Sequence, residues 1–302
     1  MRMNEYKKLF RSQKLRHVIL DLFRFIPDKQ MLRLQNRLKM GKKLNLTNPQ
    51  TYTEKLQWYK LYYRDPLMTR CADKHLVREY LTERGFGDLL CQEYGVYDNP
   101  EDINLKALPD RFVIKTTNGS GTNIFCTDKS RIDFSDAKKR LKNWIKRDCY
   151  GLGREWAYKD INPKIIVEEY LEDKDNMYDG INDYKFMCFN GKVSYVVLDV
   201  DRYVAHKRSI YDADWNYIDV GTDCEKLGDL VSKPEGFEEM KQIAESLAKD
   251  FPCVRVDLYW INHRTYFGEL TFYPWTGYVV FDPVSFDREL GDKFQLPGKI
   301  CE

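Results

Sequence analysis

Long hydrophobic runs are missing from this sequence: no segment approaches the roughly 18 consecutive apolar residues that a membrane-spanning helix needs. The first apolar cluster, VILDLF from Val18, is interrupted by Asp21 and follows a charged stretch, so we expect no secretory signal. The eight cysteines form no CxxC pair and no zinc-like cluster. Scattered cysteines of this kind are typical of reduced thiols rather than of disulfides or a structural metal. The composition therefore predicts a cytoplasmic protein.

Two common nucleotide-binding signatures are also missing. The stretch FVIKTTNGSGTNIF, Phe112 to Phe125, has no Lys-Ser or Lys-Thr after its glycines, which excludes a Walker A loop. No HRD or DFG tripeptide follows its Val-Ile-Lys, which excludes a protein kinase. Backbone N–H groups of Gly119, Ser120 and Gly121 could still surround a phosphate while Lys115 supplies positive charge. A plain hairpin turn is the alternative interpretation of this stretch.

The 302 residues, 43% of them hydrophobic and 32% charged, indicate one composite globular unit or two tightly packed domains. The formal net charge of +2 hides an excess of Lys and Arg in residues 1–43, which contain only three acidic residues. This excess is either a solvated helical face or a contact for an anionic partner such as a membrane surface or an acidic polymer. We expect no nucleic-acid partner, because no recognisable binding motif accompanies the basic residues.

The apolar pattern predicts helices up to about Gly87, and then a strand, loop, helix and strand over residues 112–171. From Asp183 the pattern is mostly β, with Asn190-Gly191 as a strong hairpin signature between two apolar strands. A helix follows over residues 237–249. This order favours an α+β fold rather than a doubly wound dinucleotide fold.

The stretch VRVDLYWINHRTYFGELTFYPWTG, Val254 to Gly277, predicts a β-hairpin. A two-residue loop at residues 262–263 would place Val256 opposite Glu269, whereas a three-residue loop over 262–264 keeps one face apolar and the other polar. We therefore predict the longer loop and the pairs Asp257–Glu269, Arg255–Thr271 and Val256–Leu270.

Two carboxylates directly opposite each other repel and need compensation. Three sources are available: the neighbouring Arg255, a raised pKa on one carboxyl group, or a bound cation. Paired carboxylates are suitable ligands for Mg²⁺, particularly when nucleotide phosphates complete its coordination. A solvated, exposed hairpin remains the structural alternative.

The order of these elements resembles the ATP-grasp superfamily. The chain looks most like its TupA-like branch, which is linked to teichuronopeptide and other bacterial surface-polysaccharide pathways. Six blocks carry the resemblance: NPQTYTEKLQWYKLYYRDPL, ADKHLVREYL, IIVEEYLED, DYKFMCFNGKV, DRYVAHKRSIYDADWN and VRVDLYWINHRTYFGELTFYP. The resemblance extends from about Asn48 to the end, and the basic N-terminus lies outside it.

The resemblance implies an α+β fold in which two subdomains grip ATP. We expect a basic helical segment (1–47), a helical part of the ATP-grasp unit (48–111), a lid with the glycine-rich loop (112–172) and a C-terminal subdomain with the metal-binding hairpin (173–302). Lys74 and Lys115 would contact the phosphates. The other implied ATP-binding residues are Gly119, Ser120 and Gly121 in the lid, Glu168, Glu169 and Leu171 at the adenine, and Asp183 at the ribose.

The implied cofactors are ATP and Mg²⁺, with two ions held by Asp257, Glu269 and Thr271. Thr271 stands where many ATP-grasp enzymes have Asn, and its hydroxyl can still ligate Mg²⁺. Arg255 and Lys185 would stabilise charged intermediates. The implied activity is a carboxylate–amine ligase that forms an amide through an acyl phosphate. It would join an amine or amino acid to a uronic acid of a capsular or surface polysaccharide or its precursor.

The segment RYVAHKRS contributes Arg202, His206 and Arg208, which could bind phosphates or a uronic-acid carboxylate, although a solvated cationic loop is equally consistent. Two other functions stay open. Asp199 and Asp201 imitate the DxD of a metal-dependent glycosyltransferase, and a polymer-binding protein could retain a decayed ATP site. We expect a cytoplasmic enzyme, with peripheral contact at the inner membrane surface through residues 1–43 as a further possibility.

Overall fold

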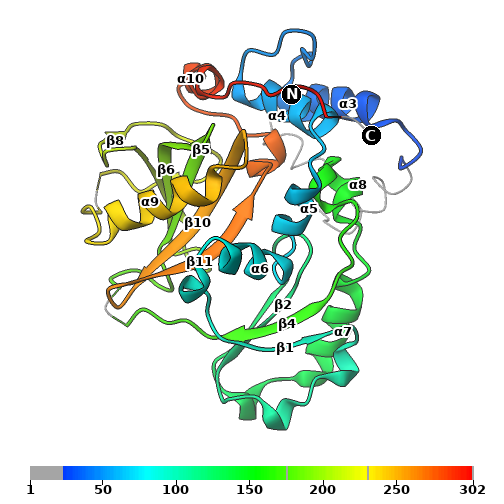
Figure 1. Ribbon diagram of the computed structural model, residues 1–302, viewed down its shortest axis with the longest axis vertical. Coiled ribbons are helices and arrows are strands. Elements are labelled where there is room, and N and C mark those ends of the chain that lie inside the picture. Colours follow the sequence, from blue (N-terminus) through cyan, green and yellow to red (C-terminus); the bar gives the residue numbers. More distant parts are fainter. Residues whose placement is uncertain (1–22, 175, 230, 301–302) are drawn as a thin grey trace.

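The computed structural model of the protein describes residues 23–174, 176–229 and 231–300. Two β-sheets face each other, and helices cover their outer sides and one end of the molecule (Figure 1). Helices and antiparallel sheets therefore occur together, as the sequence pattern predicts. The helical pattern expected before Gly87 is found for the described residues.

The smaller sheet has the strand order β1-β4-β2-β3, and all its pairs are antiparallel. Its strands are β1 (Glu93–Tyr97), β2 (Phe112–Thr116), β3 (Asn123–Cys126) and β4 (Ile165–Glu169). Helix α7 (Phe134–Trp144) packs against it and closes a separate hydrophobic core that contains Phe112, Leu141 and Val167. Strand β1 lies before residue 112 in the chain and still joins this sheet as an edge strand; the domain boundaries stay a prediction.

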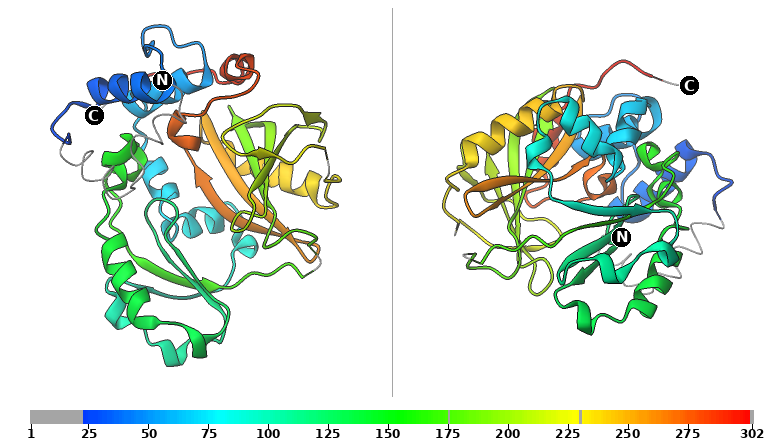
Figure 2. Two further views of the ribbon diagram at one scale, coloured as in Figure 1. Left: turned by 180° about the vertical axis from the view of Figure 1, so that it is seen from behind. Right: turned by 60° about the horizontal axis from the view of Figure 1, so that its bottom comes forward.

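The larger sheet has the order β11-β10-β5-β6-β7-β8, and β9 pairs with β7. Its strands are β5 (Asp183–Phe189), β6 (Lys192–Val200), β7 (Lys207–Asp212), β8 (Tyr217–Ile218), β9 (Glu225–Lys226), β10 (Cys253–Ile261) and β11 (Arg264–Thr271). Helix α9 (Phe237–Ala248) packs on β10, β5 and β6 and covers the outer face (Figure 2). The opposite face of this sheet carries charged side chains and turns toward the smaller sheet.

The remaining helices gather around and between the sheets: α3 (Asp28–Met40), α4 (Tyr52–Tyr62), α5 (Pro66–Ala72), α6 (Leu76–Glu83), α8 (Cys149–Gly153) and α10 (Ser285–Lys293), with short 3-10 turns at Gly87–Leu89, Pro100–Asp102, Leu105–Ala107, Lys129–Arg131, Trp156–Tyr158 and Pro274–Gly277. Thr51 and Glu54 form a capping box at the start of α4, which satisfies otherwise free backbone N–H groups. Within the part of the chain that the structure describes, no helix has the length and apolar character of a membrane span.

The β10–β11 hairpin confirms the predicted strand pairs but not the predicted loop. Asp257 pairs with Glu269, Arg255 with Thr271 and Val256 with Leu270. The loop, however, has two residues, Asn262 and His263, whose φ angles are 50° and 59°. Positive φ at both positions is typical of the tight turn that matches the twist of a hairpin.

A β-bulge reconciles the short loop with these pairs. The partner of Leu258 is Phe267, whereas the partner of Asp257 is Glu269, so Gly268 is an extra residue on β11. One extra residue shifts the register by one and restores a common face for the two carboxylates. The prediction of a three-residue loop was wrong because the bulge at Gly268 supplies the same one-residue shift in register.

Candidate functional site

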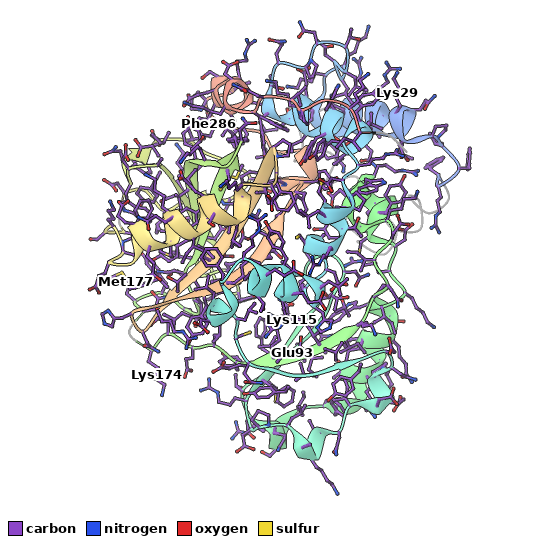
Figure 3. All side chains as sticks on the ribbon, viewed as in Figure 1. Lys29, Glu93, Lys115, Lys174, Met177 and Phe286 are labelled. Carbon is purple, nitrogen blue, oxygen red and sulfur yellow. The ribbon has the colours of Figure 1, made fainter. Side chains whose placement is uncertain are left out.

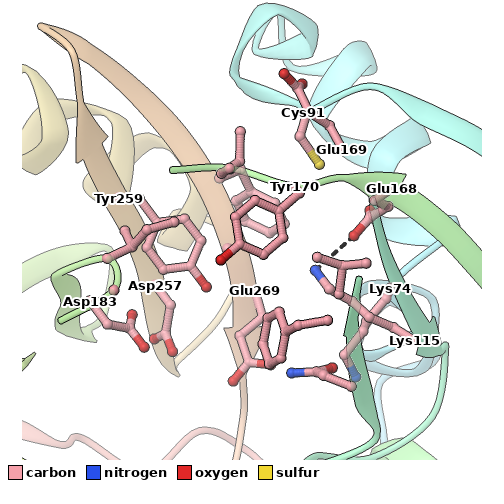
Figure 4. A pocket seen from close by; sticks show the side chains of 18 of the residues that line it. Lys74, Cys91, Lys115, Glu168, Glu169, Tyr170, Asp183, Asp257, Tyr259 and Glu269 are labelled. Atoms are coloured by element: carbon pink, nitrogen blue, oxygen red, sulfur yellow. Dashed lines mark hydrogen bonds and ion pairs between the residues drawn. The ribbon is translucent and has the colours of Figure 1, made fainter. Parts of the chain in front are cut away.

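The two sheets enclose a cavity of about 410 Å³. Figure 4 shows carboxylates of the larger sheet on one side of it, and Lys74, Lys115 and Glu168 on the other. The cavity brings together most of the residues that the sequence predicted: Lys74, Lys115, Ser120, Gly121, Glu168, Glu169, Leu171, Asp183, Arg202, Asp257 and Glu269. The remaining predicted residues, Gly119, Lys185, Arg255, Thr271, His206 and Arg208, do not line the cavity.

One wall is positively charged. Lys115 on β2 donates a hydrogen bond of 2.7 Å to Glu168 on the neighbouring β4, and Arg78 reaches the other oxygen of Glu168 at 3.2 Å. Burial opposes the charge on Lys115, but the adjacent Glu168 outweighs it and raises the pKa of Lys115. Burial likewise opposes the charge on Glu168, and Lys115 and Arg78 outweigh it and lower that pKa. Arg78 also pairs with Glu93 at 3.5 Å, so Lys115 and the neighbouring Lys74 are the cations available to an anionic ligand.

The glycine-rich loop, which connects β2 to β3, lies next to this wall. Gly119 and Gly121 have φ angles of 64° and 72°, a conformation that glycine adopts without strain. The Lys74 ammonium donates a hydrogen bond to the carbonyl of Gly119, and the Lys74 N–H donates one to Thr117. A Cβ atom at position 119 would lie 2.6 Å from the Cys149 sulfur, so close packing also favours glycine there. Lys74 therefore fixes the loop that it lies beside.

Arg255 holds the two carboxylates of the opposite wall together. Its guanidinium donates two hydrogen bonds of 2.6 Å to Asp257 and one of 3.2 Å to Glu269. Burial raises the pKa of Asp257 to about 6, although Arg255 and Lys185 oppose this effect. Burial also opposes the charge on Glu269, but Arg255 and Lys74 outweigh it and lower the pKa of Glu269. Glu269 is therefore ionised at neutral pH.

The same wall can be tested as a magnesium site. The described residues contain no group of three or more His, Cys, Asp or Glu side chains arranged around one point. Asp257 and Glu269 nevertheless form a pair at the cavity, and the Thr271 hydroxyl bonds to Glu269 at 2.9 Å. Asp183 Oδ1 is buried with no hydrogen-bond partner in the described part of the chain. The oxygens of Asp257, Glu269 and Thr271 are hard donors that fit Mg²⁺ when phosphate oxygens supply further ligands.

A buried charge network continues behind the carboxylate wall. Lys185 lies between three carboxylates and ion-pairs with Asp183, with Asp199 at 3.3 Å and with Asp257 at 3.8 Å. Asp183 also pairs with Arg202. Lys185 therefore contacts Asp183 and Asp257, which line the cavity, but does not line the cavity itself. Its positive charge affects the cavity from behind these two carboxylates.

Asp199 lies against three basic side chains, Arg208, His206 and Lys185. Arg208 donates two hydrogen bonds to it, of 2.6 and 3.0 Å, and His206 Nε2 lies 3.0 Å away. Burial opposes the charge, yet His206, Lys185 and Arg208 hold the pKa of Asp199 well below its usual range. Asp201 has a left-handed backbone (φ 51°) and accepts a hydrogen bond from the N–H of Asp179. This geometry disfavours a DxD metal site, and with it the glycosyltransferase alternative.

The three residues predicted for substrate binding separate in the structure. Arg202 lines the cavity beside Asp183. Arg208 is buried and lies over the ring of Trp275, with 5.4 Å between its guanidinium carbon and the ring centroid. His206 is half-buried next to Asp199. His206 and Arg208 therefore meet at Asp199, whereas Arg202 belongs to the exposed turn over 202–205 and reaches Asp183.

Sequence reasoning missed several residues of the cavity, among them Arg78 and Tyr259. Arg78 contacts Glu168, and its position four residues after Lys74 in the same block was an available signal. Tyr259 lines the cavity and shares a strand face with Asp257, which the alternation of β10 predicts. The other missed lining residues are Val77, Leu90, Cys91, Val113, Asn123, Phe125, Tyr170, Asp179, Gly180, Ile181, Tyr203, Phe267 and Gly268.

Solved structures similar to this chain include ATP-grasp proteins. A D-alanine–D-alanine ligase from Bacillus anthracis is 16% identical with a TM-score of 0.43, and the match covers 74% of this chain and 65% of that one. The ATP-grasp ligase PsnB complexed with minimal precursor is 12% identical with a TM-score of 0.41, covering 70% of this chain and 55% of that one. The chain thus spans less than two thirds of the length of either. A RimK domain ATP-grasp protein from Sphaerobacter thermophilus is 9% identical with a TM-score of 0.40, covering 75% and 69%.

No curated protein matches the chain. A family model described as TupA-like ATPgrasp matches residues 54–295, which is most of the sequence. The match confirms the resemblance found in the six sequence blocks and the α+β ATP-grasp fold class expected from them. The protein therefore belongs to the TupA-like ATP-grasp family.

Proposed function

We propose that this protein is an ATP- and Mg²⁺-dependent carboxylate–amine ligase. The observation that carries the proposal is the position of Lys115 and Glu168 on one sheet across a single cavity from Asp257 and Glu269 on the other. A nucleotide triphosphate needs cations along its phosphates and carboxylates for its metal ion, and this cavity provides both. Membership of an ATP-grasp family supports the same interpretation.

The residues of the positive wall bind ATP in this proposal. Lys74 and Lys115 contact the phosphates, and the backbone of Gly119, Ser120 and Gly121 covers them. Glu168, Glu169 and Leu171, around the end of β4, contact the adenine. Asp183, whose Oδ1 lacks a hydrogen-bond partner among the described residues, accepts a hydrogen bond from a ribose hydroxyl.

Asp257, Glu269 and Thr271 are the residues that would hold magnesium, and the bound metal would neutralise phosphate charge. Arg255 keeps Asp257 and Glu269 adjacent, and together with Lys185 it offsets the negative charge that develops during phosphoryl transfer. Both cations act from behind the cavity wall, so their contribution is electrostatic rather than covalent.

The proposed reaction has two steps. An oxygen of the substrate carboxylate bonds to the γ-phosphorus of ATP while the bond from that phosphorus to the bridging oxygen breaks, which yields ADP and an acyl phosphate. The amine nitrogen then attacks the acyl carbon, phosphate leaves, and the nitrogen loses a proton. The proposed carboxylate belongs to a uronic acid of a capsular or surface polysaccharide or its precursor, and the amine to an amino acid or another small amine. Arg202, His206 and Arg208 are the proposed contacts to this acceptor.

The test is an assay of the full chain with ATP, Mg²⁺, a uronic acid and a panel of amines, in which ADP and phosphate are measured. ADP release that requires both the uronic acid and an amine supports the ligase. Turnover of a nucleotide sugar without ATP consumption would overturn it, and absence of both ATP binding and turnover would favour the polymer-binding alternative.

A matched pair of variants links the assay to the cavity. Lys115→Met removes the cation that pairs with Glu168 at 2.7 Å, whereas Lys138→Met removes a lysine that pairs with Glu101 at the same distance on the outside of the lid. Only the first should lose ATP affinity, by roughly tenfold or more. Equal ATP affinity in both variants would argue against this cavity as the ATP site.

A further inference from the structure

The outer face of helix α3 carries one row of basic side chains and a second row of leucine side chains. Lys29, Arg33 and Arg37 follow one another at intervals of four residues and are exposed. Leu34 and Leu38, each one position further along, form a second row and are 42% and 39% exposed. Residues four apart lie on the same side of a helix, so each row follows one line along α3. Successive residues are about 100° apart around the helix axis, so the two rows lie next to each other on the exposed half of the helix. Figure 3 marks Lys29 on this helix, at the end of the molecule away from the small sheet.

The inner face of α3 is firmly packed. Leu32 is fully buried in a cluster with residues of α4, and Gln35 donates a hydrogen bond of 3.2 Å to the carbonyl of Leu152 on α8. At the start of the helix, Asp28 accepts hydrogen bonds from Tyr150 and Arg154. These contacts hold the helix firmly in one orientation. The outer face is exposed because this orientation turns it away from the rest of the protein.

The charge around this face is strongly positive. Over residues 23–43 the only acidic residue is Asp28, and it is already engaged by Tyr150 and Arg154. Lys29, Arg33 and Arg37 make no ion pair with any described residue. Just ahead of the helix, Phe25 is 80% exposed. The segment also contains Lys39, Lys43, Arg24, which pairs with Asp148, and Lys42, which pairs with Asp287.

We propose that the outer face of α3, together with Phe25, is a docking surface for an anionic lipid bilayer. Basic side chains attract the headgroups, while exposed leucine and phenylalanine side chains gain by leaving water at the boundary of the acyl chains. An acidic polysaccharide would be attracted by the same cations but would gain nothing from the leucines. The apolar row therefore favours the bilayer. This proposal does not depend on the activity proposed above.

The test measures sedimentation of the full chain with vesicles of phosphatidylcholine alone or mixed with phosphatidylglycerol. We expect binding to the anionic vesicles that weakens as salt is added. Arg33→Gln with Arg37→Gln should lower this binding by about thirtyfold, because each basic residue at an anionic surface contributes a factor of about five. Leu34→Gln with Leu38→Gln should lower it by about tenfold or more.

The matched control is Lys139→Gln with Arg140→Gln, which removes two exposed cations from α7 on the lid and should leave vesicle binding unchanged. Circular dichroism and thermal unfolding verify that each variant folds. The proposal is overturned if the chain ignores anionic vesicles or if neither α3 variant changes binding. It is also overturned if the chain binds hyaluronan but not anionic vesicles, and if the leucine substitutions leave the binding of hyaluronan unchanged.

Discussion

Arg255 and Asp257, two residues apart on β10, are joined by two hydrogen bonds of 2.6 Å, and the same guanidinium reaches Glu269 across the hairpin at 3.2 Å. Two carboxylates placed opposite each other repel, and this geometry shows which side chain offsets the repulsion. A cation supplied by the chain already compensates part of their repulsion before any ligand binds. Arg255 therefore has a structural role in addition to the proposed electrostatic one.

Replacement of Arg255 by Met should destabilise the fold by about 3–5 kcal/mol, because it leaves the buried Asp257 carboxylate without its main partner. Equilibrium unfolding in urea measures the loss. The double variant Arg255→Met with Asp257→Asn should recover much of the stability, since both charges are then gone. Two losses that simply add would show that the ion pair does not couple these residues.

Replacement of Glu269 by Gln should abolish ATP turnover and barely change stability. The Glu269 side chain is 36% exposed and faces the cavity, so its ion pair with Arg255 contributes less than about 1 kcal/mol. We expect a fall in kcat of about a hundredfold or more, measured as ADP release. The control is Glu79→Gln, which removes a carboxylate paired with Arg70 on another surface. Retained activity in Glu269→Gln would remove this residue from the proposed metal site.

Replacement of Gly268 by Ala should disturb the bulge that aligns the two carboxylates. A Cβ atom at this position would lie 2.9 Å from the carbonyl oxygen of Asp257 and 3.1 Å from the Tyr259 ring. Relief of these contacts should cost about 1–3 kcal/mol of stability and reduce ATP turnover. Gly298→Ala, where nothing lies within 4 Å, is the control. Unchanged stability in Gly268→Ala would show that the bulge tolerates a side chain.

Lys60 predicts a pH dependence of stability. It is buried on α4, donates hydrogen bonds of 2.9 Å to the carbonyls of Gly153 and Thr276, and burial lowers its pKa to about 7. An unfolded lysine has a pKa near 10.4, so between about pH 7 and 10 the unfolded chain binds more protons at this position than the folded one. The contribution of Lys60 to the free energy of unfolding therefore rises with pH over this window, by up to about 1.4 kcal/mol per unit.

Urea unfolding of wild type and Lys60→Met at several pH values measures this effect, since titrating groups that do not interact with Lys60 cancel in the difference. The wild type should gain stability relative to the variant as pH rises above about 7. Lys139→Met, an exposed lysine on α7, should show no such trend. Parallel curves for wild type and Lys60→Met would contradict the lowered pKa.

Much of the candidate site was predictable because it depends on local pattern. Alternation along β10 and β11 placed Asp257 and Glu269 on one face, and the pairing is as predicted. The loop was mispredicted because the bulge at Gly268 depends on how closely two backbones approach, which alternation does not encode. Arg78 was missed because its partner Glu168 lies 90 positions away in the chain and meets it only when β4 packs near α6.

The sequence by itself determined the local structure: the Thr51–Glu54 cap, the Asn190-Gly191 turn, the strand alternation and the blocks that indicate the family. These features depend on backbone preferences over a few residues. Only the tertiary structure decided which cation serves which carboxylate, so that Arg202 meets Asp183 while Arg208 is buried against Asp199. The reason is physical: charge pairing depends on distances of a few ångströms between strands, and strand order and sheet packing set those distances.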